Sequence, residues 1–279
     1  MRILVLGSNG MLGHIVSHYF SKSNKYKLYN LSRKSNNRIN SIQCDVQDLT
    51  KLENIIKKTK PKVIINCIGL LISDTEKSIE NAKYINSFFP KHLVELSKKY
   101  NYKVIHISTD CVFRGTKGLY NEYSIKDAID AYGITKSKGE IDSPGHLTIR
   151  TSIIGPDLKK NGTGLFQWIM NQKGEVKGFD NVKWTGVTTI ELSKAIEFAI
   201  LNSIEGIWNL TNENTISKYE LLNMLINAFN ISKVHLVKDL TNTSNKSLTS
   251  IRSINYQVPS YEKMIIELKE YFESNIDLY

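Results

Sequence analysis

Tyr132 and Lys136 are a pair of side chains whose types and spacing could carry out chemistry on a carbonyl group. Four residues apart on a helix, they would lie on one face. A phenol can protonate the oxygen of a ketone that takes up a hydride, and a neighbouring ammonium group lowers the pKa of that phenol. Because lysine is common in this chain, the pair alone is weak evidence. Its weight comes from Thr109, which ends an apolar run and could hold the ketone oxygen beside Tyr132.

Three glycines near the N-terminus have the spacing of a dinucleotide-binding turn. They lie between the apolar run Arg2–Leu6 and a stretch with helical periodicity. Glycines at such positions permit a tight turn and a close approach of the backbone to a pyrophosphate, while free N–H groups at the helix start face the anion. We therefore expect a nicotinamide dinucleotide to bind here. The residues expected to contact it are Gly7, Asn9, Gly10, Met11, Leu12 and Gly13.

The end of the second predicted strand carries Ser32 and Arg33, where an NAD site would place a carboxylate against the ribose. A carboxylate would repel a 2′-phosphate, whereas a hydroxyl and a guanidinium group could bind it. Residues 1–44 also contain seven Lys or Arg and no Asp or Glu, which suits an anionic ligand. The sequence therefore favours NADP(H), with NAD(H) also possible.

The elements that must position these residues alternate between strand and helix in the first half of the chain. This alternation is typical of an α/β fold with a Rossmann-like, doubly wound parallel sheet. In such a sheet, ligands bind at the carboxyl ends of the strands, which would bring Thr109, Tyr132 and Lys136 together beside the cofactor. The predicted strands are 2–6, 27–31, 41–44, 62–67, 103–108 and 147–151, and the predicted helices are 11–20, 48–58, 77–99 and 132–140.

The second half of the chain has a looser pattern. We expect residues 1–150 to form the NAD(P)-binding domain and residues 151–279 to form a small substrate-binding lobe, interleaved with elements that return to the sheet at about 188–210. The elements predicted in this half are helices at 188–201, 217–229 and 261–273, strands at 207–210 and 233–238, and a polar loop at 241–253.

Composition excludes several classes of protein. With 41% hydrophobic residues and 23% charged residues, the chain has the composition of a globular protein. Its net charge of +10 comes from scattered lysines, so we expect a solvated surface and no nucleic-acid partner. No apolar run is long enough for a membrane span. The three cysteines show no metal-binding spacing, so we expect no metal and a cytoplasmic location.

The order of these motifs resembles the extended short-chain dehydrogenase/reductase family, and within it the dTDP-4-dehydrorhamnose reductases. The resemblance covers residues 1 to about 156 well and the remainder loosely. The matching segments are the glycine turn, Val63–Gly69, His106–Phe113, Tyr120–Glu122, Tyr132–Lys136 with Gly139–Glu140, and Arg150–Thr151 with Gly155–Pro156.

The resemblance implies a function and a set of site residues. Thr109, Tyr132 and Lys136 would form the catalytic triad of an enzyme that uses NADPH to reduce the C4 ketone of a nucleotide-linked 4-keto-6-deoxy-hexose. Asp110 would contact the sugar. The cofactor would also contact the residues that follow the third and fourth strands, which are Asp45, Val46, Cys67, Ile68 and Gly69.

Two segments depart from the pattern of the rhamnose enzyme. Cys111 stands where that enzyme usually has tyrosine, and the segment 182–188 differs as well. Because both regions contact the sugar in relatives, the sequence leaves the hexose and the nucleotide open. Trp184 and Arg252 are the candidates for closing the substrate pocket.

Alternatives therefore stay open. Cys111 could make the protein a bifunctional epimerase and reductase, because a thiolate could remove a proton beside the ketone. The second acid for that reaction would be Lys159, Lys160 or Lys183. A 4,6-dehydratase is disfavoured, because the acidic pair after the triad threonine is absent. A regulatory subunit of the same fold is the alternative outside enzymes, and a homodimer is possible.

Overall fold

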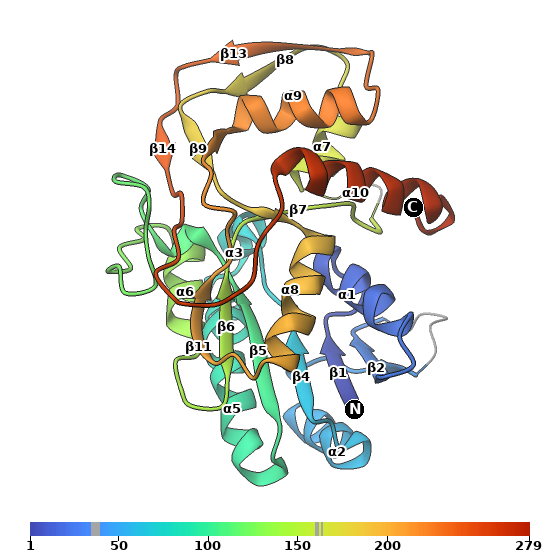
Figure 1. Ribbon diagram of the computed structural model, residues 1–279. Helices are drawn as coiled ribbons and strands as arrows, with labels where there is room; N and C mark the ends of the chain where they lie inside the picture. The colour runs from blue at the N-terminus through green and yellow to red at the C-terminus, as the bar shows by residue number, and fades with distance from the viewer. Residues whose placement is uncertain (35–39, 160–161, 163) are drawn as a thin grey trace.

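A seven-stranded parallel sheet forms the centre of the molecule (Figure 1). The computed structural model describes residues 1–279 except 35–39, 160–161 and 163. The strand order is β11-β6-β5-β4-β1-β2-β3, and every neighbouring pair is parallel. The strands are β1 (Arg2–Leu6), β2 (Lys27–Ser32), β3 (Ser41–Gln43), β4 (Val63–Asn66), β5 (Lys103–Ser108), β6 (Leu147–Arg150) and β11 (Gly206–Asn209).

The strand order reverses beside β1, because the chain first moves outward to β2 and β3 and then returns to β4 on the other side of β1. Such a reversal opens a crevice at the carboxyl ends of the strands, where ligands bind in folds of this type. The predicted doubly wound sheet is therefore confirmed, and its switch point lies between β1 and β4.

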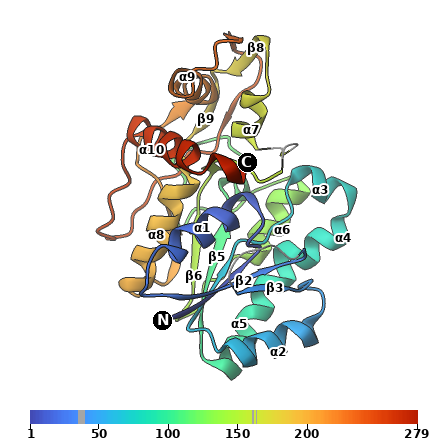
Figure 2. The ribbon, with the colours of Figure 1, turned by 90° about the vertical axis from the view of Figure 1, so that its right-hand side faces the viewer.

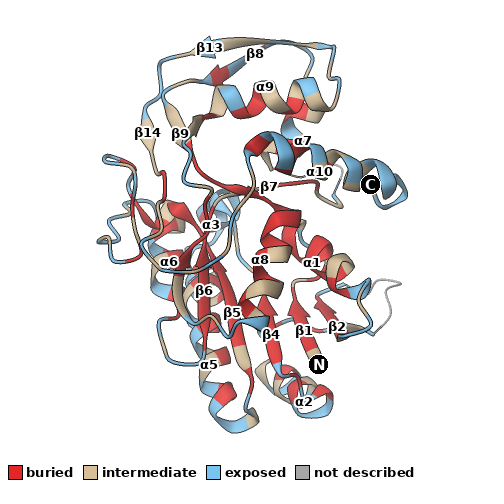
Figure 3. Ribbon diagram, viewed as in Figure 1, coloured by how far each residue is buried: buried red, intermediate tan, exposed pale blue. Residues whose placement is uncertain are grey.

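Helices cover both faces of the sheet (Figure 2). Because side chains alternate along a strand, Ile3 and Val5 join the apolar core under α1 and α8, while Leu4 and Leu6 join the core under α2 and α5. Both cores are buried, as the red strands in Figure 3 show. The covering helices are α1 (Met11–Ser21) and α8 (Thr189–Leu201) on one face, and α2 (Leu49–Thr59), α5 (Phe89–Tyr100) and α6 (Ala131–Gly139) on the other.

The predicted helix at 77–99 is divided into several pieces. They are α3 (Ile72–Lys77), α4 (Ile79–Ala82), a π-helical turn at Lys83–Phe88, and α5. Pro90 stands in the first turn of α5, directly after the π-helical turn. The widened turn before it faces α6 and carries Asn86, whose contacts are described below.

The C-terminal lobe lies above the carboxyl edge of the sheet in Figure 1. Its short strands pair as β10-β7, β12-β9-β14 and β13-β8, and most of them were not predicted. The elements are β7 (Ile153–Ile154), α7 (Leu165–Met170), β8 (Gly174–Phe179), β9 (Val182–Trp184), β10 (Val187–Thr188), β12 (Ile216–Ser217), α9 (Lys218–Ala228), β13 (Val234–Asp239), β14 (Ser244–Asn245) and α10 (Tyr261–Ser274). Single 3₁₀ turns occur at Asp110–Val112 and Ile276–Leu278.

In the part of the chain that the structure describes, no helix is both long enough and apolar enough to cross a membrane. The same residues include no group of three or more His, Cys, Asp or Glu side chains placed to hold a metal ion.

Candidate active site

The glycine turn joins β1 to α1 in a conformation that requires glycine. Gly7 has a φ of +78°, and a Cβ at this position would lie 2.9 Å from Cγ1 of Ile68. A Cβ on Gly13 would lie 2.1 Å from the Gly7 carbonyl oxygen. The N-cap residue of α1 is Gly10, which has no side chain to cap the helix. The turn therefore presents uncapped N–H groups at a helix start, which is an arrangement that fits the pyrophosphate of a dinucleotide.

The end of β2 lies against this turn. The backbone N–H groups of Gly7 and Ser8 both donate to the carbonyl oxygen of Leu31. Beyond it, the buried Ser32 hydroxyl donates to the carbonyl of Lys34 at 2.7 Å, and the Asn9 amide donates to the same oxygen at 3.0 Å. Ser32 thus shapes the loop that carries the exposed Arg33.

The segments after β3 and β4 complete the rim of the crevice. Asp45 is exposed, and its carboxylate accepts the backbone N–H of Gln47 at 3.0 Å. The Cys67 backbone passes close to Gly7, and burial raises the pKa of its thiol to about 12. Gly69 lies beside the Lys136 ammonium group, because a Cβ there would be 3.7 Å from Nζ. Val46 and Ile68 lie in the same two segments.

Thr109, Tyr132 and Lys136 meet at the carboxyl end of β5. The buried Thr109 hydroxyl accepts the N–H of Cys111 at 3.1 Å, and it lies close enough to Tyr132 to act on the pKa of the phenol. Tyr132 lies in the first turn of α6, one turn before Lys136. The Lys136 ammonium group donates to the carbonyl of Ile107 at 2.7 Å. The structure therefore brings together the three side chains that the sequence singled out.

The protonation of the site differs from the sequence expectation. Burial lowers the pKa of Lys136 to about 8, opposed by the charge of Glu140. The pKa of Tyr132 is raised, first by burial and then by Cys111, whereas we expected Lys136 to lower it. The physical reason is that the Lys136 ammonium group is bound to a backbone carbonyl, while the phenol is desolvated.

The chain is similar to known proteins over most of its length. The family model described as "RmlD substrate binding domain" matches residues 1–259. The chain belongs to this family. The resemblance that the motifs indicated is thus confirmed.

Relatives of this RmlD-family chain include proteins of different function. Methionine adenosyltransferase 2 subunit beta of Xenopus tropicalis is 24% identical over 252 residues, which cover 84% of this chain and 74% of that protein. dTDP-4-dehydrorhamnose reductase of Aggregatibacter actinomycetemcomitans is 29% identical over 157 residues, which cover 54% and 51%. The crystal structure of dTDP-4-dehydrorhamnose reductase from Bacillus anthracis in complex with NADP superposes with a TM-score of 0.80 at 20% identity, covering 98% of this chain and 99% of that one.

Asn86 was missed by the sequence analysis, although it links two parts of the RmlD-family site. Its side-chain amide donates to the carbonyl of Leu70 at 3.1 Å and to the Thr135 hydroxyl at 3.2 Å, and its oxygen accepts the Leu70 N–H at 2.9 Å. The side chain is completely buried. Asn86 therefore fixes the loop after β4 against α6, next to Lys136. Nothing local in the sequence marks it, because both partners are distant in the chain.

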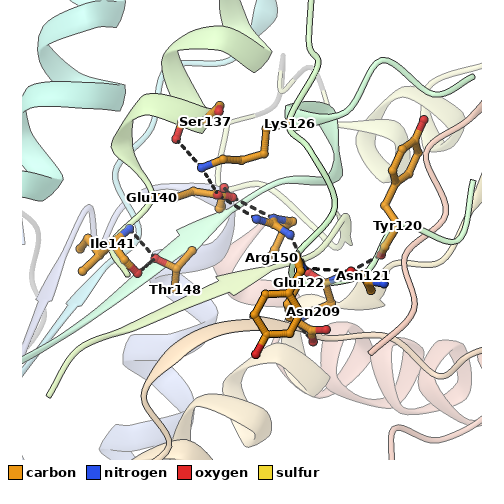
Figure 4. A network of polar contacts seen from close by, with 12 residues as sticks. Tyr120, Asn121, Glu122, Lys126, Ser137, Glu140, Ile141, Thr148, Arg150 and Asn209 are labelled. Atoms are coloured by element: carbon orange, nitrogen blue, oxygen red, sulfur yellow. Dashed lines mark hydrogen bonds and ion pairs between the residues drawn. The ribbon is translucent and has the colours of Figure 1, made fainter. Parts of the chain in front are cut away.

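A buried ion pair between Glu140 and Arg150 lies at the end of α6 (Figure 4). The Glu140 carboxylate accepts Nε and Nη2 of Arg150 at 2.9 and 2.8 Å, and it also accepts Lys126 at 3.0 Å and the Ser108 hydroxyl at 2.8 Å. Arg150 donates further to Asn209 at 3.1 Å. These contacts hold the pKa of Glu140 below its ordinary value, led by the Arg150 hydrogen bond against the opposing effect of burial. The network fixes the end of α6 to β5 directly before Thr109.

Asp110 and Cys111 directly follow Thr109 at the end of β5. Asp110 is buried at the strand end, where its carboxylate accepts the Thr109 hydroxyl at 3.1 Å. Cys111 follows it, and burial together with the charge of Asp110 raises the pKa of its thiol to about 12. Both residues lie beside the triad.

Trp184 and Arg252, the candidates for closing the substrate pocket, lie in different parts of the structure. Trp184 is only 3% exposed and packs against Tyr261 in the core of the C-terminal lobe. Arg252 donates to the carbonyls of Glu205 and Ile207 at 2.6 and 2.9 Å, at the amino end of β11. This is the end of the sheet opposite to the triad, so the structure does not bring Arg252 to the site.

Of the lysines considered as a second acid, the structure describes Lys159 and Lys183, and no contact between described residues joins either of them to the triad. Lys183 donates to the carbonyl of Asp180 at 3.1 Å. Lys159 lies in the segment after β7, and Lys160 lies outside the described residues.

Proposed function

We propose that this protein reduces the C4 ketone of a nucleotide-linked 4-keto-6-deoxy-hexose with NADPH. The observation that carries the proposal is the convergence of Thr109, Tyr132 and Lys136 at the carboxyl end of β5, beside a glycine turn that fits a dinucleotide. The similarity to dTDP-4-dehydrorhamnose reductases supports the substrate class. A reduced nicotinamide, when bound, would supply the hydride.

Each residue of the triad has a separate task in this proposal. Thr109 orients the ketone oxygen beside the phenol, since both side chains lie at the carboxyl end of β5. Tyr132 gives the proton that the oxygen needs as negative charge develops on it. Lys136 holds the ribose hydroxyls of the cofactor near Gly69. The Glu140–Arg150 pair keeps the helix that carries Tyr132 and Lys136 in place.

The cofactor would be held by the residues that line the crevice. The uncapped start of α1 would receive the pyrophosphate, and Arg33 together with the loop shaped by Ser32 would receive a 2′-phosphate. Asp45 and Val46 would lie near the adenine.

The direct test is turnover of keto-sugars. The purified protein is incubated with NADPH and enzymatically made dTDP-, UDP- or GDP-linked 4-keto-6-deoxy sugars, and the loss of NADPH absorbance is followed. We expect oxidation of NADPH with at least one sugar, with a product reduced at C4 by NMR. No oxidation with any member of the panel contradicts the proposal.

A regulatory subunit is the second candidate, because relatives named methionine adenosyltransferase 2 subunit beta match 84% of the chain. Pull-down with a methionine adenosyltransferase catalytic subunit tests it. Binding of that subunit without any turnover of keto-sugars would favour this candidate, whereas turnover without binding favours the reductase.

A further inference from the structure

A buried polar contact joins the carboxyl ends of β4 and β5, next to the loop that is expected to contact the cofactor. Asn66 and His106 are aligned in these neighbouring strands, and both side chains are completely buried. The amide nitrogen of Asn66 lies 3.1 Å from Nδ1 of His106. The amide oxygen of Asn66 accepts the backbone N–H of Ile68 at 3.1 Å. Asn66 therefore links the His106 ring to the segment 67–69, which forms part of the rim of the crevice.

The hydrogen bonds of Asn66 determine where the His106 ring carries its proton. Because the amide oxygen faces the N–H of Ile68, the amide nitrogen faces the ring, and this nitrogen can only donate. Nδ1 of His106 is therefore an acceptor without a proton. The ring is neutral and carries its proton on Nε2, since a charged ring would place a second donor against the amide nitrogen.

Lys136 favours the same neutral ring. Burial, and then the charge of the Lys136 ammonium group, hold the pKa of His106 well below its ordinary value. A second positive charge in this buried place would oppose the charge of Lys136. The neutral ring therefore leaves the positive charge on Lys136, which lies beside Gly69 in the same loop.

The contacts of His106 differ from those of His146, a buried histidine at the other end of the sheet. Both ring nitrogens of His146 have partners, because Nδ1 accepts the N–H of Val104 at 3.0 Å and Nε2 lies 3.2 Å from the Ser97 hydroxyl. Within the part of the chain that the structure describes, Nε2 of His106 has no hydrogen-bond partner. A buried N–H without a partner is unfavourable, so stability alone does not explain the His106 ring. Its contact with Asn66 points to another role.

We propose that His106 is a positioning residue for the cofactor and that it acts through Asn66. The neutral ring accepts the amide group of Asn66 and so keeps the amide oxygen directed at the N–H of Ile68. This contact fixes the segment 67–69 between the glycine turn and Lys136, where Lys136 would hold the ribose of the cofactor. The assignment rests on the proposed function, and it extends the cofactor site to a residue inside the sheet.

NMR of the unaltered protein with ¹⁵N-labelled histidine tests the position of the ring proton. We expect the His106 ring to be neutral at neutral pH, with its proton on Nε2. The signals that disappear in His106→Asn identify the ring. A proton on Nδ1 overturns the proposal, because the Asn66 amide could then no longer donate to the ring. This measurement decides even where a variant with a changed core does not fold.

Calorimetric binding of NADP⁺ and NAD⁺ tests the link to the cofactor without turnover. We expect His106→Leu to weaken binding of the preferred dinucleotide by about 5- to 100-fold, because the buried Asn66 amide loses its acceptor. His106→Asn supplies an amide oxygen near the position of Nδ1 and should retain most of the affinity. His146→Leu is the matched control, since it also removes a buried histidine. It should lower stability but bind the dinucleotide as the unaltered protein does.

Hydrogen exchange of the Ile68 amide separates the proposed link from a general loss of stability. Its rate is measured against the rate of the Ile64 amide, which lies in the buried part of β4. We expect this ratio to rise in His106→Leu, where Asn66 is less firmly held, and to stay unchanged in His146→Leu.

The outcomes distinguish this proposal from the proposed function. Unchanged dinucleotide affinity in a folded His106→Leu protein overturns the positioning role. Turnover of a keto-sugar by a protein whose affinity for the dinucleotide does not depend on His106 contradicts the positioning role alone. Dinucleotide binding that depends on His106, without turnover of any keto-sugar, contradicts the reductase alone.

Discussion

At the scale of single residues, the phenol of Tyr132 is the group whose removal should affect chemistry but not binding. We expect Tyr132→Phe to lower kcat by about 100- to 10,000-fold, because the proton donor is lost while the ring is kept. The affinity for NADPH should stay unchanged. Tyr123→Phe, which alters a tyrosine that is 82% exposed on the preceding loop, should leave kcat unchanged. A Tyr132→Phe enzyme with near-native kcat on its substrate would remove Tyr132 from the mechanism.

Arg33 is the residue that should decide between the two nicotinamide cofactors. Its side chain is exposed beside a loop that Ser32 and Asn9 fix, so it can meet a 2′-phosphate without rearrangement of the buried residues. We expect Arg33→Ala to reduce the preference for NADPH over NADH by about 10- to 150-fold. Fluorescence titration with both cofactors measures this, with Lys22→Ala on the exposed end of α1 as the control. An unchanged preference would show that another group reads the phosphate.

Cys111 tests whether the protein also epimerises its substrate. A pKa of about 12 keeps the sulfur as a thiol at neutral pH, and a thiol does not remove a proton from carbon. We therefore expect no deuterium at C3 or C5 when the keto-sugar is incubated with the protein in D₂O without NADPH. Mass spectrometry and NMR of the recovered sugar give the answer. Deuterium incorporation that disappears in Cys111→Ser would establish the epimerase.

At the scale of elements, the Glu140–Arg150 pair joins α6 to the sheet. Removing one member of a buried pair leaves the other charge uncompensated, so we expect Glu140→Gln to lower the free energy of unfolding by about 3–5 kcal/mol. Urea denaturation measures this, with Glu95→Gln as the control because its pair with Lys98 is exposed. A loss as small as that of the control would contradict a structural role.

The Glu140–Arg150 pair also makes the free energy of unfolding depend on pH. The pKa of Glu140 is lower in the folded protein than in the unfolded chain. Ionised Glu140 therefore adds to the free energy of unfolding at pH values above the ordinary pKa of glutamate. This contribution is lost as the pH falls through the pKa of Glu140 in the folded protein. The difference in stability between the unaltered protein and Glu140→Gln should shrink at acidic pH.

The elements also show what the sequence could predict and what it could not. The glycine turn and the spacing of Tyr132 and Lys136 are local patterns, and the strand ends that unite them with Thr109 follow from the parallel sheet. The sequence indicated one continuous helix over 77–99 and gave no sign of its interruption. The reason is that Asn86, in the interrupted part, bonds with Leu70 and Thr135, which are distant in the chain.

The C-terminal lobe was predicted least well for the same reason. Its strands are two to six residues long and pair across large separations in sequence, such as β9 with β14.

At the scale of the whole molecule, the two halves of the chain share structural elements. The strand β11 forms one edge of the main sheet and the helix α8 packs on its face, although both follow the first strands of the C-terminal lobe. The carboxylate of Glu122 accepts the Asn209 N–H at 3.1 Å and the Ser250 hydroxyl at 2.6 Å, so it joins β11 to the segment before α10. Neither half can therefore lose its structure without exposing apolar surface of the other.

This interleaving predicts a single cooperative unfolding transition. Differential scanning calorimetry should show one peak whose calorimetric and van't Hoff enthalpies agree. NADPH at 100 times its Kd should stabilise the whole molecule by about 2.7 kcal/mol, although its site is formed by the first half. The single peak should then move upward by several degrees without dividing. Two peaks, of which NADPH moves only one, would show instead that the C-terminal lobe unfolds as an independent domain.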